Sequence, residues 1–217
     1  MDLRNAIRTN GAVRHFTDEP VPRSMVLEIL DDARFAASGG NRQPWRVALV
    51  EDPDLRHELA ALMRPVWDEY VAFERRDVAP YNVVEYERPE HVVAGRPNPL
   101  LDHIDDVPVV LAVAADLSKV AMMDSGLDRA PITGGGSIYP FCWNLLLSAR
   151  AHGLGGVMTT FASHVEPAVG PALGLPPHHA LAATIFLGVP RHQPTKLRRR
   201  DVAEFATLDR FDGKPLI

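Results

Sequence analysis

Residues 37–50, ASGGNRQPWRVALV, bring together residue types that can hold a polar ligand. Ser38, Asn41 and Gln43 supply one hydroxyl and two side-chain amides, around two glycines and a Pro-Trp pair. An ordinary connection between a helix and a strand needs glycine and proline, but it needs neither the amides nor the indole. Because hydroxyls and amides form hydrogen bonds and glycine lets another group approach the backbone, these residues form a candidate ligand contact. We call residues 38–45 the elbow.

Two clusters of basic residues, near opposite ends of the chain, form a second candidate. The segment AIRTNGAVRHF carries Arg8 and Arg14 around a glycine, and KLRRR carries Lys196 and the arginines at 198–200. A guanidinium presents a planar set of N–H donors that fits a phosphate group. Each cluster by itself is more typical of a solvated surface. Taken with the elbow, the clusters indicate a ligand that carries a phosphate, a polyol and a polar aromatic ring system.

Other kinds of chemistry have little support in the sequence. The glycines of GLGG at 153–156 follow a predicted helix and precede a predicted strand, which is the reverse of a dinucleotide-binding fingerprint. The nine histidines lack metal-binding spacing, and no Gly-x-Ser-x-Gly nucleophile motif is present. We therefore expect neither a metal site nor hydrolytic chemistry. The single cysteine, Cys142, lies in an apolar run, where we expect a buried hydrophobic residue rather than a nucleophile.

The composition is that of an ordinary globular protein. The 217 residues are 46% hydrophobic and 24% charged, with a formal net charge of −5. A negative net charge argues against nucleic acid or a membrane surface as a partner. No stretch approaches the ~20 consecutive apolar residues that span a bilayer, and the N-terminal residues lack the apolar core of a signal peptide. We therefore expect a cytoplasmic protein that binds neither nucleic acid nor a membrane.

Hydrophobic periodicity and turn signals predict alternating helices and strands. The predicted helices span 2–8, 20–38, 52–71, 137–153 and 163–174, and the predicted strands span 45–52, 107–116, 154–161 and 179–190. No linker interrupts this alternation. The pattern therefore predicts one domain over residues 1–217, with a single sheet between helical layers, of the α/β or the α+β class.

Two segments fall outside this pattern. Residues 76–105 carry four prolines and no clean period, which is typical of lids and interaction segments but also of disordered segments. The tail continues ~25 residues past the last strong strand, against the usual ~4–6 residues of a connection. We expect residues 76–105 to form a lid or interface segment. We expect residues 205–217 to pack on a neighbouring subunit, with a frayed terminus as the alternative.

Several of these segments resemble the FMN-dependent nitroreductase family. GAVRHFTDEPVP and ILDDARFAASGGNRQPWRVALV resemble the family's opening, with its basic loop, its helix and its APSxxNxQPW elbow. GGGSIYPFCWNLLLSARAHGLGGVMTTF resembles the family's central dimer helix and the strand that follows it. LGVPRHQPTKLRRRDVAEF resembles the family's closing segment. These blocks run in the family's order along most of the chain, and the elbow is the most specific of them.

The resemblance implies an α+β fold, in which a single central, mostly antiparallel sheet is flanked by helices, and a domain-exchanged homodimer. It implies that FMN lies at the interface between two subunits, where both of them hold it. Arg14 matches the basic residue at the N1–O2 edge of the flavin ring. Ser38, Gly39 and Asn41 match the elbow that approaches the ring and the ribityl chain.

Four further residues receive roles from the same resemblance. Thr159 and Thr160 match backbone donors near N5 of the flavin ring. Lys196 and Arg199 match the basic pair on the phosphate group. The implied site therefore draws on segments from both ends and from the middle of the chain.

The phosphate loop departs from the family's pattern. Asn10 and Ala12 stand where the family commonly has an arginine and a serine. One charged contact and one hydroxyl are therefore missing at matched positions. Arg8 is the nearby residue that could supply the missing charge.

The implied function is that of an FMN-dependent oxidoreductase. It would take a hydride from NADPH or NADH and reduce a small organic acceptor, such as a nitroaromatic compound or a quinone, by a ping-pong mechanism. Because the cofactor carries the chemistry, no catalytic side chain is expected. One alternative is a protein that stores FMN behind a closed lid and reduces little. Another is a dehalogenase or a flavin-fragmenting enzyme of the same fold.

Overall fold

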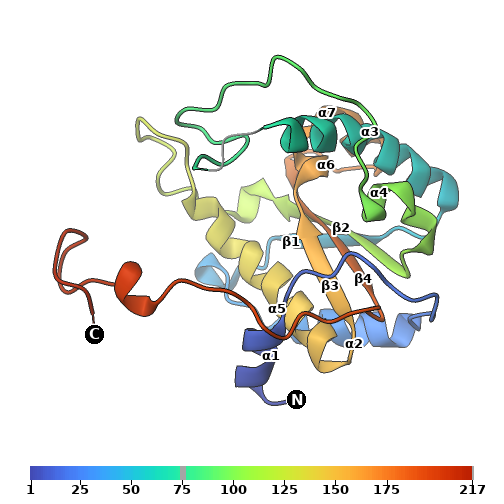
Figure 1. Ribbon diagram of the computed structural model, residues 1–217, viewed down its shortest axis with the longest axis horizontal. Coiled ribbons are helices and arrows are strands. Elements are labelled where there is room, and N and C mark those ends of the chain that lie inside the picture. The colour runs from blue at the N-terminus through green and yellow to red at the C-terminus, as the bar shows by residue number, and fades with distance from the viewer. Residues whose placement is uncertain (74–76, 217) are drawn as a thin grey trace.

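The computed structural model describes residues 1–73 and 77–216 of the chain (Figure 1). Residue 76 of the predicted lid or interface segment and residue 217 of the predicted tail lie outside the described residues. The helices are α1 (Leu3–Thr9), α2 (Arg23–Ala33), α3 (Pro53–Ala72), α4 (Pro99–Asp102), α5 (Tyr139–Ala151), α6 (Phe161–His164) and α7 (Glu166–Ala172). The strands are β1 (Trp45–Leu49), β2 (Val109–Asp116), β3 (Gly155–Thr159) and β4 (His179–Gly188). Short 3₁₀ turns include η1 (Gly39–Asn41), η2 (Ile104–Asp106) and η4 (Thr133–Ser137).

The four strands form one sheet in the order β1-β2-β4-β3, and every neighbouring pair is antiparallel. The antiparallel pairing decides between the two predicted fold classes in favour of α+β. Because the strand order places β1 and β3 at the two outer positions, the residues that flank these strands lie at opposite edges of the sheet. This separation places the candidate site residues next to β1 and those next to β3 in two separate groups.

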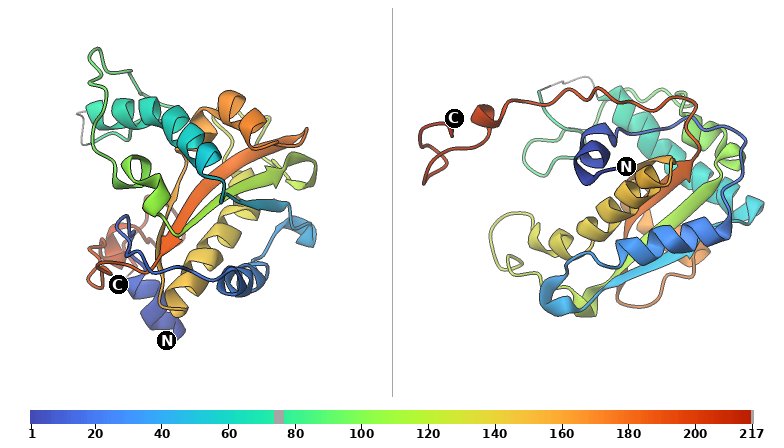
Figure 2. Two further views of the ribbon diagram at one scale, coloured as in Figure 1. Left: turned by 90° about the vertical axis from the view of Figure 1, so that its right-hand side faces the viewer. Right: turned by 90° about the horizontal axis from the view of Figure 1, so that it is seen from below.

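Helices cover both faces of the sheet (Figure 2). On one face α2 and α5 pack on a core that includes Leu111 and Val113, and on the other α3, α6 and α7 pack on a core that includes Val110 and Ala112. Successive β2 residues therefore point into different cores. This arrangement explains why the predicted strand at 107–116 is apolar throughout instead of alternating with polar residues.

Three predicted elements end earlier than expected, and one of them is the strand predicted over 45–52, which ends at Leu49. The helix predicted over 20–38 ends at Ala33, because Phe35 and Ala36 donate to carbonyl groups three residues back and tighten the last turn. The strand predicted over 154–161 ends at Thr159, because Thr160 is the N-cap of α6. The other predicted helices and strands are present with small shifts at their ends.

The C-terminal segment leaves the body of the molecule. After β4 the chain passes the N-terminal residues and then extends outward, as the red trace in Figures 1 and 2 shows. Phe205 and Phe211, on this extension, have exposed side chains. The predicted packing of this tail on a neighbouring subunit stays a prediction.

Candidate functional site

The two basic clusters from opposite ends of the chain lie side by side. The side-chain amide of Gln193 donates to the carbonyl of Thr9 at 2.9 Å. A Cβ atom added to Gly11 would lie 2.8 Å from Leu197 Cδ2, so glycine at this position lets the two segments approach closely. Lys196 is exposed next to this contact. The structure therefore confirms that the segments around Arg8 and around Lys196 meet.

The phosphate-loop residues differ in their environment. Arg8, Ala12 and Arg199 are exposed, whereas the side chain of Asn10 is 8% exposed. Within the described residues, Asn10 Nδ2 is buried and has no hydrogen-bond partner. A buried polar atom without a partner is rare in a folded protein, because its desolvation is not compensated. Asn10 therefore presents a donor that a ligand could satisfy.

The N-terminal segment continues along the edge of the sheet. Val13 N–H donates to Gly156 O at 3.0 Å, and Thr17 N–H donates to Val189 O at 2.8 Å. These bonds hold residues 12–17 against β3 and the end of β4. As a result, Arg14 lies near the residues that follow β3.

Arg14, Thr159 and Thr160 line one cavity of about 260 Å³. Thr159 Oγ1 is buried and has no hydrogen-bond partner within the described part of the chain. Arg14 is exposed and makes no ion pair among the same residues. The structure thus brings together three of the residues singled out in the sequence. Among them, the Thr159 hydroxyl and the Arg14 guanidinium are available to contact a ligand.

Three aromatic side chains form a wall of this cavity. The ring centroid of Phe161 lies 5.9 Å from that of Trp67 and 6.0 Å from that of Tyr70, both in edge-on arrangements. The rings of Trp67 and Tyr70 stack at 6.1 Å. Sequence reasoning missed this wall. The only signal was the placement of Trp67 and Tyr70 three residues apart on one predicted helix, which also fits an ordinary core.

The elbow is fixed by its own polar contacts. Ser38 Oγ accepts from Gln43 N–H at 2.9 Å, and Gly39 N–H donates to Ser137 Oγ at 3.1 Å. The side-chain amide of Gln43 donates to Asn41 Oδ1 at 3.2 Å. Asn41 and Gln43 have φ angles of 53° and 48°, a conformation in which asparagine is more common than most residues. The amide of Gln43 is therefore used within the elbow, whereas Gly39 and Asn41 are exposed.

The Pro-Trp pair anchors the elbow to the sheet. Pro44 is buried, and the Trp45 ring stacks on Phe141 of α5 with 4.9 Å between centroids. On the next residue of α5, burial raises the pKa of the Cys142 thiol to about 12, as expected for a structural cysteine. The predictions of an anchored elbow and of a buried Cys142 are both confirmed.

The elbow does not meet Arg14 within one chain. It directly precedes β1, at one edge of the sheet, whereas Thr159 and Thr160 follow β3 at the other edge. One chain therefore holds two separate halves of the predicted site. Ser38, Gly39 and Asn41 form the first half, and Asn10, Ala12, Arg14, Thr159, Thr160, Lys196 and Arg199 form the second.

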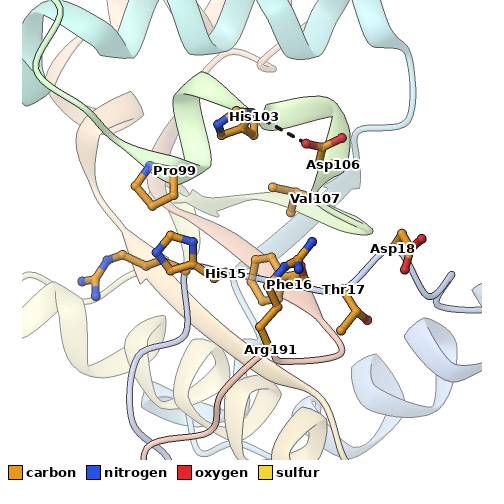
Figure 3. A pocket seen from close by; sticks show the side chains of 10 residues that line it. His15, Phe16, Thr17, Asp18, Pro99, His103, Asp106, Val107 and Arg191 are labelled. Atoms are coloured by element: carbon orange, nitrogen blue, oxygen red, sulfur yellow. Dashed lines mark hydrogen bonds and ion pairs between the residues drawn. The ribbon is translucent and has the colours of Figure 1, made fainter.

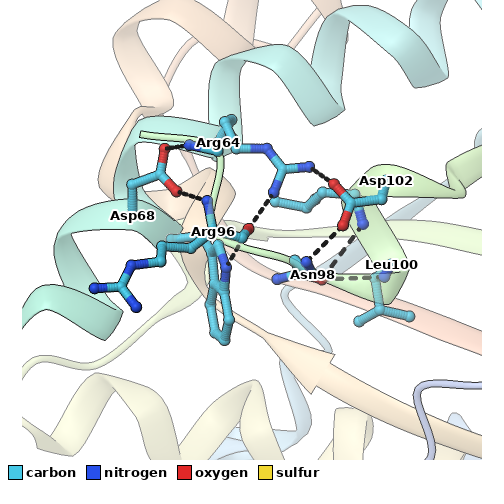
Figure 4. Close-up of polar contacts among 9 residues, drawn as sticks. Arg64, Asp68, Arg96, Asn98, Leu100 and Asp102 are labelled. Atoms are coloured by element: carbon cyan, nitrogen blue, oxygen red, sulfur yellow. Dashed lines mark hydrogen bonds and ion pairs between the residues drawn. The ribbon is translucent and has the colours of Figure 1, made fainter. Parts of the chain in front are cut away.

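The chain at residues 95–96 is held against α3 by a buried carboxylate (Figure 4). Asp68 is 3% exposed and accepts from the N–H groups of Gly95 and Arg96 at 3.0 and 2.9 Å. Arg64 and the Trp67 indole both donate to Arg96 O. These bonds fix the chain just before Asn98–Leu100, which line the cavity with Arg14.

A second carboxylate of α3 holds an earlier part of the same segment. Glu69 accepts from the Tyr86 hydroxyl at 2.7 Å and pairs with Arg88 Nε at 2.7 Å. Burial, with help from Glu69, raises the pKa of Tyr81 to about 12, so its hydroxyl keeps its proton at neutral pH. The segment is thus attached to α3 by both Asp68 and Glu69.

Within residues 1–73 and 77–216, no group of three or more His, Cys, Asp or Glu side chains is placed to hold a metal ion. None of the helices in this part of the chain combines the length and the apolar character needed to cross a bilayer.

The model of the Nitroreductase family matches residues 7–189 of this chain. The chain belongs to the nitroreductase family. It is 30% identical over 202 residues to a protein of Thermus thermophilus named NADH dehydrogenase, with 89% of each chain covered. It is also 30% identical over 189 residues to 5,6-dimethylbenzimidazole synthase of Rhodobacter capsulatus, with 87% of this chain and 83% of the relative covered.

Solved structures agree with the fold of this nitroreductase-family protein. A putative nitroreductase from Desulfovibrio desulfuricans, in complex with FMN, superposes with a TM-score of 0.68 and 24% sequence identity. The match covers 95% of both chains. The predicted fold, a single antiparallel sheet flanked by helices, is therefore confirmed.

The buried Asp68 carboxylate leads to a first testable prediction. In an Asp68→Asn variant one acceptor oxygen becomes an N–H₂ group, so Gly95 or Arg96 loses its acceptor. A buried donor without a partner costs about 1–3 kcal/mol. We expect hydrogen exchange at the amides of Gly95 and Arg96 to become about tenfold faster or more. The control is Glu58→Gln, a change at an exposed position of the same helix. Unchanged exchange in Asp68→Asn would show that this carboxylate does not hold the segment.

Proposed function

We propose that this protein is an FMN-dependent oxidoreductase that takes a hydride from NADH or NADPH and reduces a small organic acceptor by a ping-pong mechanism. The observation that carries the proposal is the cavity on which Arg14, Thr159 and Thr160 meet beside an aromatic wall. Membership of the nitroreductase family and the Thermus relative named NADH dehydrogenase support it. Acceptors that fit an aromatic wall are flat and conjugated, such as nitroaromatic compounds and quinones.

The residues at the second half of the site fit FMN. A phosphate needs cationic donors, and Lys196 and Arg199 lie on the segment that packs against the N-terminal loop. Asn10 Nδ2 and Thr159 Oγ1 are buried atoms without partners among the described residues. Both residues lie at the β3 edge of the sheet, Asn10 toward the start of the strand and Thr159 at its end. In our proposal Asn10 and the backbone at Ala12 face the phosphate end of the cofactor, and Thr159 and Thr160 face N5 of the ring.

We also propose that a second copy of the chain completes the site. The elbow residues Ser38, Gly39 and Asn41 lie at the β1 edge, away from Arg14, so a ligand held by both halves needs two chains. Helix α5 supports this proposal. Its aromatic side chains Tyr139 and Trp143 lie one turn apart and are 40% and 42% exposed, so they are available to pack on a second chain. The extended tail would exchange onto the partner, as in a domain-exchanged homodimer.

When bound, FMN supplies the hydride-accepting chemistry. The protein's part is to bind, to orient and to exclude water. Arg14 would place a positive charge at the N1–O2 edge of the ring, where it stabilises negative charge. Trp67, Tyr70 and Phe161 would hold a flat acceptor against the ring and keep water out. No side chain has to act as acid or base.

A second candidate activity is the formation of 5,6-dimethylbenzimidazole. The observation that favours it is the synthase of Rhodobacter capsulatus, which is as similar to this chain as the Thermus protein is. The dimethylbenzene ring of that product is also part of the flavin ring system. This activity would use the same half-sites but would consume the flavin.

The proposed activity is tested by anaerobic stopped-flow mixing of the FMN-loaded protein with NADH or NADPH. We expect the visible flavin absorbance to bleach and to return when a quinone is added, with parallel lines in double-reciprocal plots of steady-state rates. Flavin that binds but stays oxidised would instead indicate a storage protein. Formation of 5,6-dimethylbenzimidazole in air would favour the second candidate. A protein that binds no FMN would contradict the proposal.

A second test separates ring contact from phosphate contact. A charge-assisted hydrogen bond contributes about 1.5–3 kcal/mol, and about 30 mV corresponds to ~1.4 kcal/mol for a two-electron couple. We therefore expect Arg14→Ala to lower the two-electron potential of the flavin by some tens of millivolts while FMN stays bound. Lys196→Ala should weaken FMN binding and leave the potential nearly unchanged. If Arg14→Ala loses FMN and the residual flavin keeps its potential, Arg14 is a phosphate contact.

A further inference from the structure

A second cavity, of about 570 Å³, adjoins the first (Figure 3). The two share Arg14 and Pro99 in their linings, so they are neighbours. It lies between the chain at residues 14–18 and the region of α4 and η2. An elongated molecule that passes Arg14 and Pro99 would occupy both cavities.

Hydrogen-bond donors, the Arg191 guanidinium and the His15 imidazole, line one part of this second cavity. Arg191 Nε donates to Phe16 O at 2.7 Å, which fixes the guanidinium and leaves its terminal amino groups available. Within residues 1–73 and 77–216, no carboxylate lies at ion-pair distance from Arg191 or from His15. His15 lies close to Pro99 in Figure 3, on the side where the first cavity joins. These groups suit a phosphate.

Carboxylates line another part. Asp18 and Asp106 lie on the far side of Arg191 from His15 in Figure 3. Asp106 is 3.7 Å from His103 Nδ1, and its side chain is 82% exposed. Within the described residues, Asp18 makes no ion pair. Carboxylates that are not neutralised repel a phosphate but accept hydrogen bonds from the hydroxyl groups of a ribose.

We propose that this cavity binds the adenosine diphosphate portion of NADH. His15 and Arg191 face the pyrophosphate, and Asp18 and Asp106 face the hydroxyl groups of the adenosine ribose. The nicotinamide then reaches the first cavity past Arg14 and Pro99. NADPH carries a phosphate in place of the ribose 2′-hydroxyl, and that phosphate meets the two carboxylates. The cavity therefore selects NADH over NADPH. This inference rests on the proposed function, because it assigns the electron donor of the same site.

The test uses two nucleotides that cannot act as hydride donors and that differ only in the 2′-phosphate, ADP and 2′-phospho-ADP (adenosine 2′-phosphate 5′-diphosphate), titrated into the FMN-loaded protein by calorimetry. Like charges brought together at a binding site weaken the complex, so we expect ADP to bind about tenfold more tightly than 2′-phospho-ADP. The double variant Asp18→Asn, Asp106→Asn should bring the two affinities within about threefold of each other. The ratio of kcat/KM for NADH to kcat/KM for NADPH should fall with it. His15→Gln should weaken both nucleotides.

The matched control is Asp105→Asn, which removes a neighbouring carboxylate that does not line the cavity. It should leave the preference for ADP unchanged. Equal binding of ADP and 2′-phospho-ADP to the unmodified protein, or an unchanged preference in the double variant, would overturn the inference. Either result can occur while NADH still bleaches the flavin, in which case the proposed function stands. A flavin that neither nucleotide can reduce contradicts the proposed function instead.

Discussion

The hydrogen bond from Val13 N–H to Gly156 O is the contact on which the candidate site depends. It attaches the N-terminal segment to the outer edge of β3 and so places Arg14 beside Thr159 and Thr160. The bond requires a close approach that only glycine allows. A Cβ atom added to Gly155 would lie 2.9 Å from Val13 Cβ, and one added to Gly156 would lie 2.8 Å from Phe186 O. Gly155 thus makes room for the N-terminal segment, and Gly156 lets β3 lie close to β4.

The sheet that carries this contact is held from both sides. Because β2 sends alternate residues into two separate cores, the sheet cannot shift toward either helical layer without opening a cavity in the other. The same rigid sheet keeps its two edges apart. The elbow lies at β1 and the Arg14 cavity lies at β3. The rigid sheet therefore fixes the position of each half-site and also keeps the two half-sites of one chain apart.

Local sequence signals predicted most of the fold. The apolar strand at 107–116 and the glycine-entered strand after α5 were recognisable because their periodicity and their turn residues agree with the final structure. The helix over 20–38 was predicted too long, because Ala37 continues the apolar pattern past the last helical residue. The choice between α/β and α+β depends on strand pairing between distant segments. Periodicity carries no information about that pairing.

The candidate site was predictable only in part. The elbow and Arg14 were recognisable from their residue types, whereas Thr159 was identified only through the family resemblance. The structure shows that Arg14 and Thr159 share a cavity. The wall of Trp67, Tyr70 and Phe161 was missed, because its members come from α3 and α6 and meet only after folding. Asp68 was missed for a related reason. Its partners are backbone N–H groups of a segment without regular structure, and such partners leave no trace in residue types.

The central claim is that each flavin site takes one half from each of two chains, and a mixed dimer tests it most directly. One chain carries Gly39→Leu, which blocks the elbow, and the other carries Lys196→Glu with Arg199→Glu. Each variant alone should bind FMN poorly. In a mixed dimer, isolated with two different tags, the intact elbow of one chain faces the intact basic residues of the other. We expect such dimers to recover one FMN for every two chains. Mixed dimers that bind no more FMN than their parents, or a Gly39→Leu protein that keeps its full FMN, would contradict the shared site.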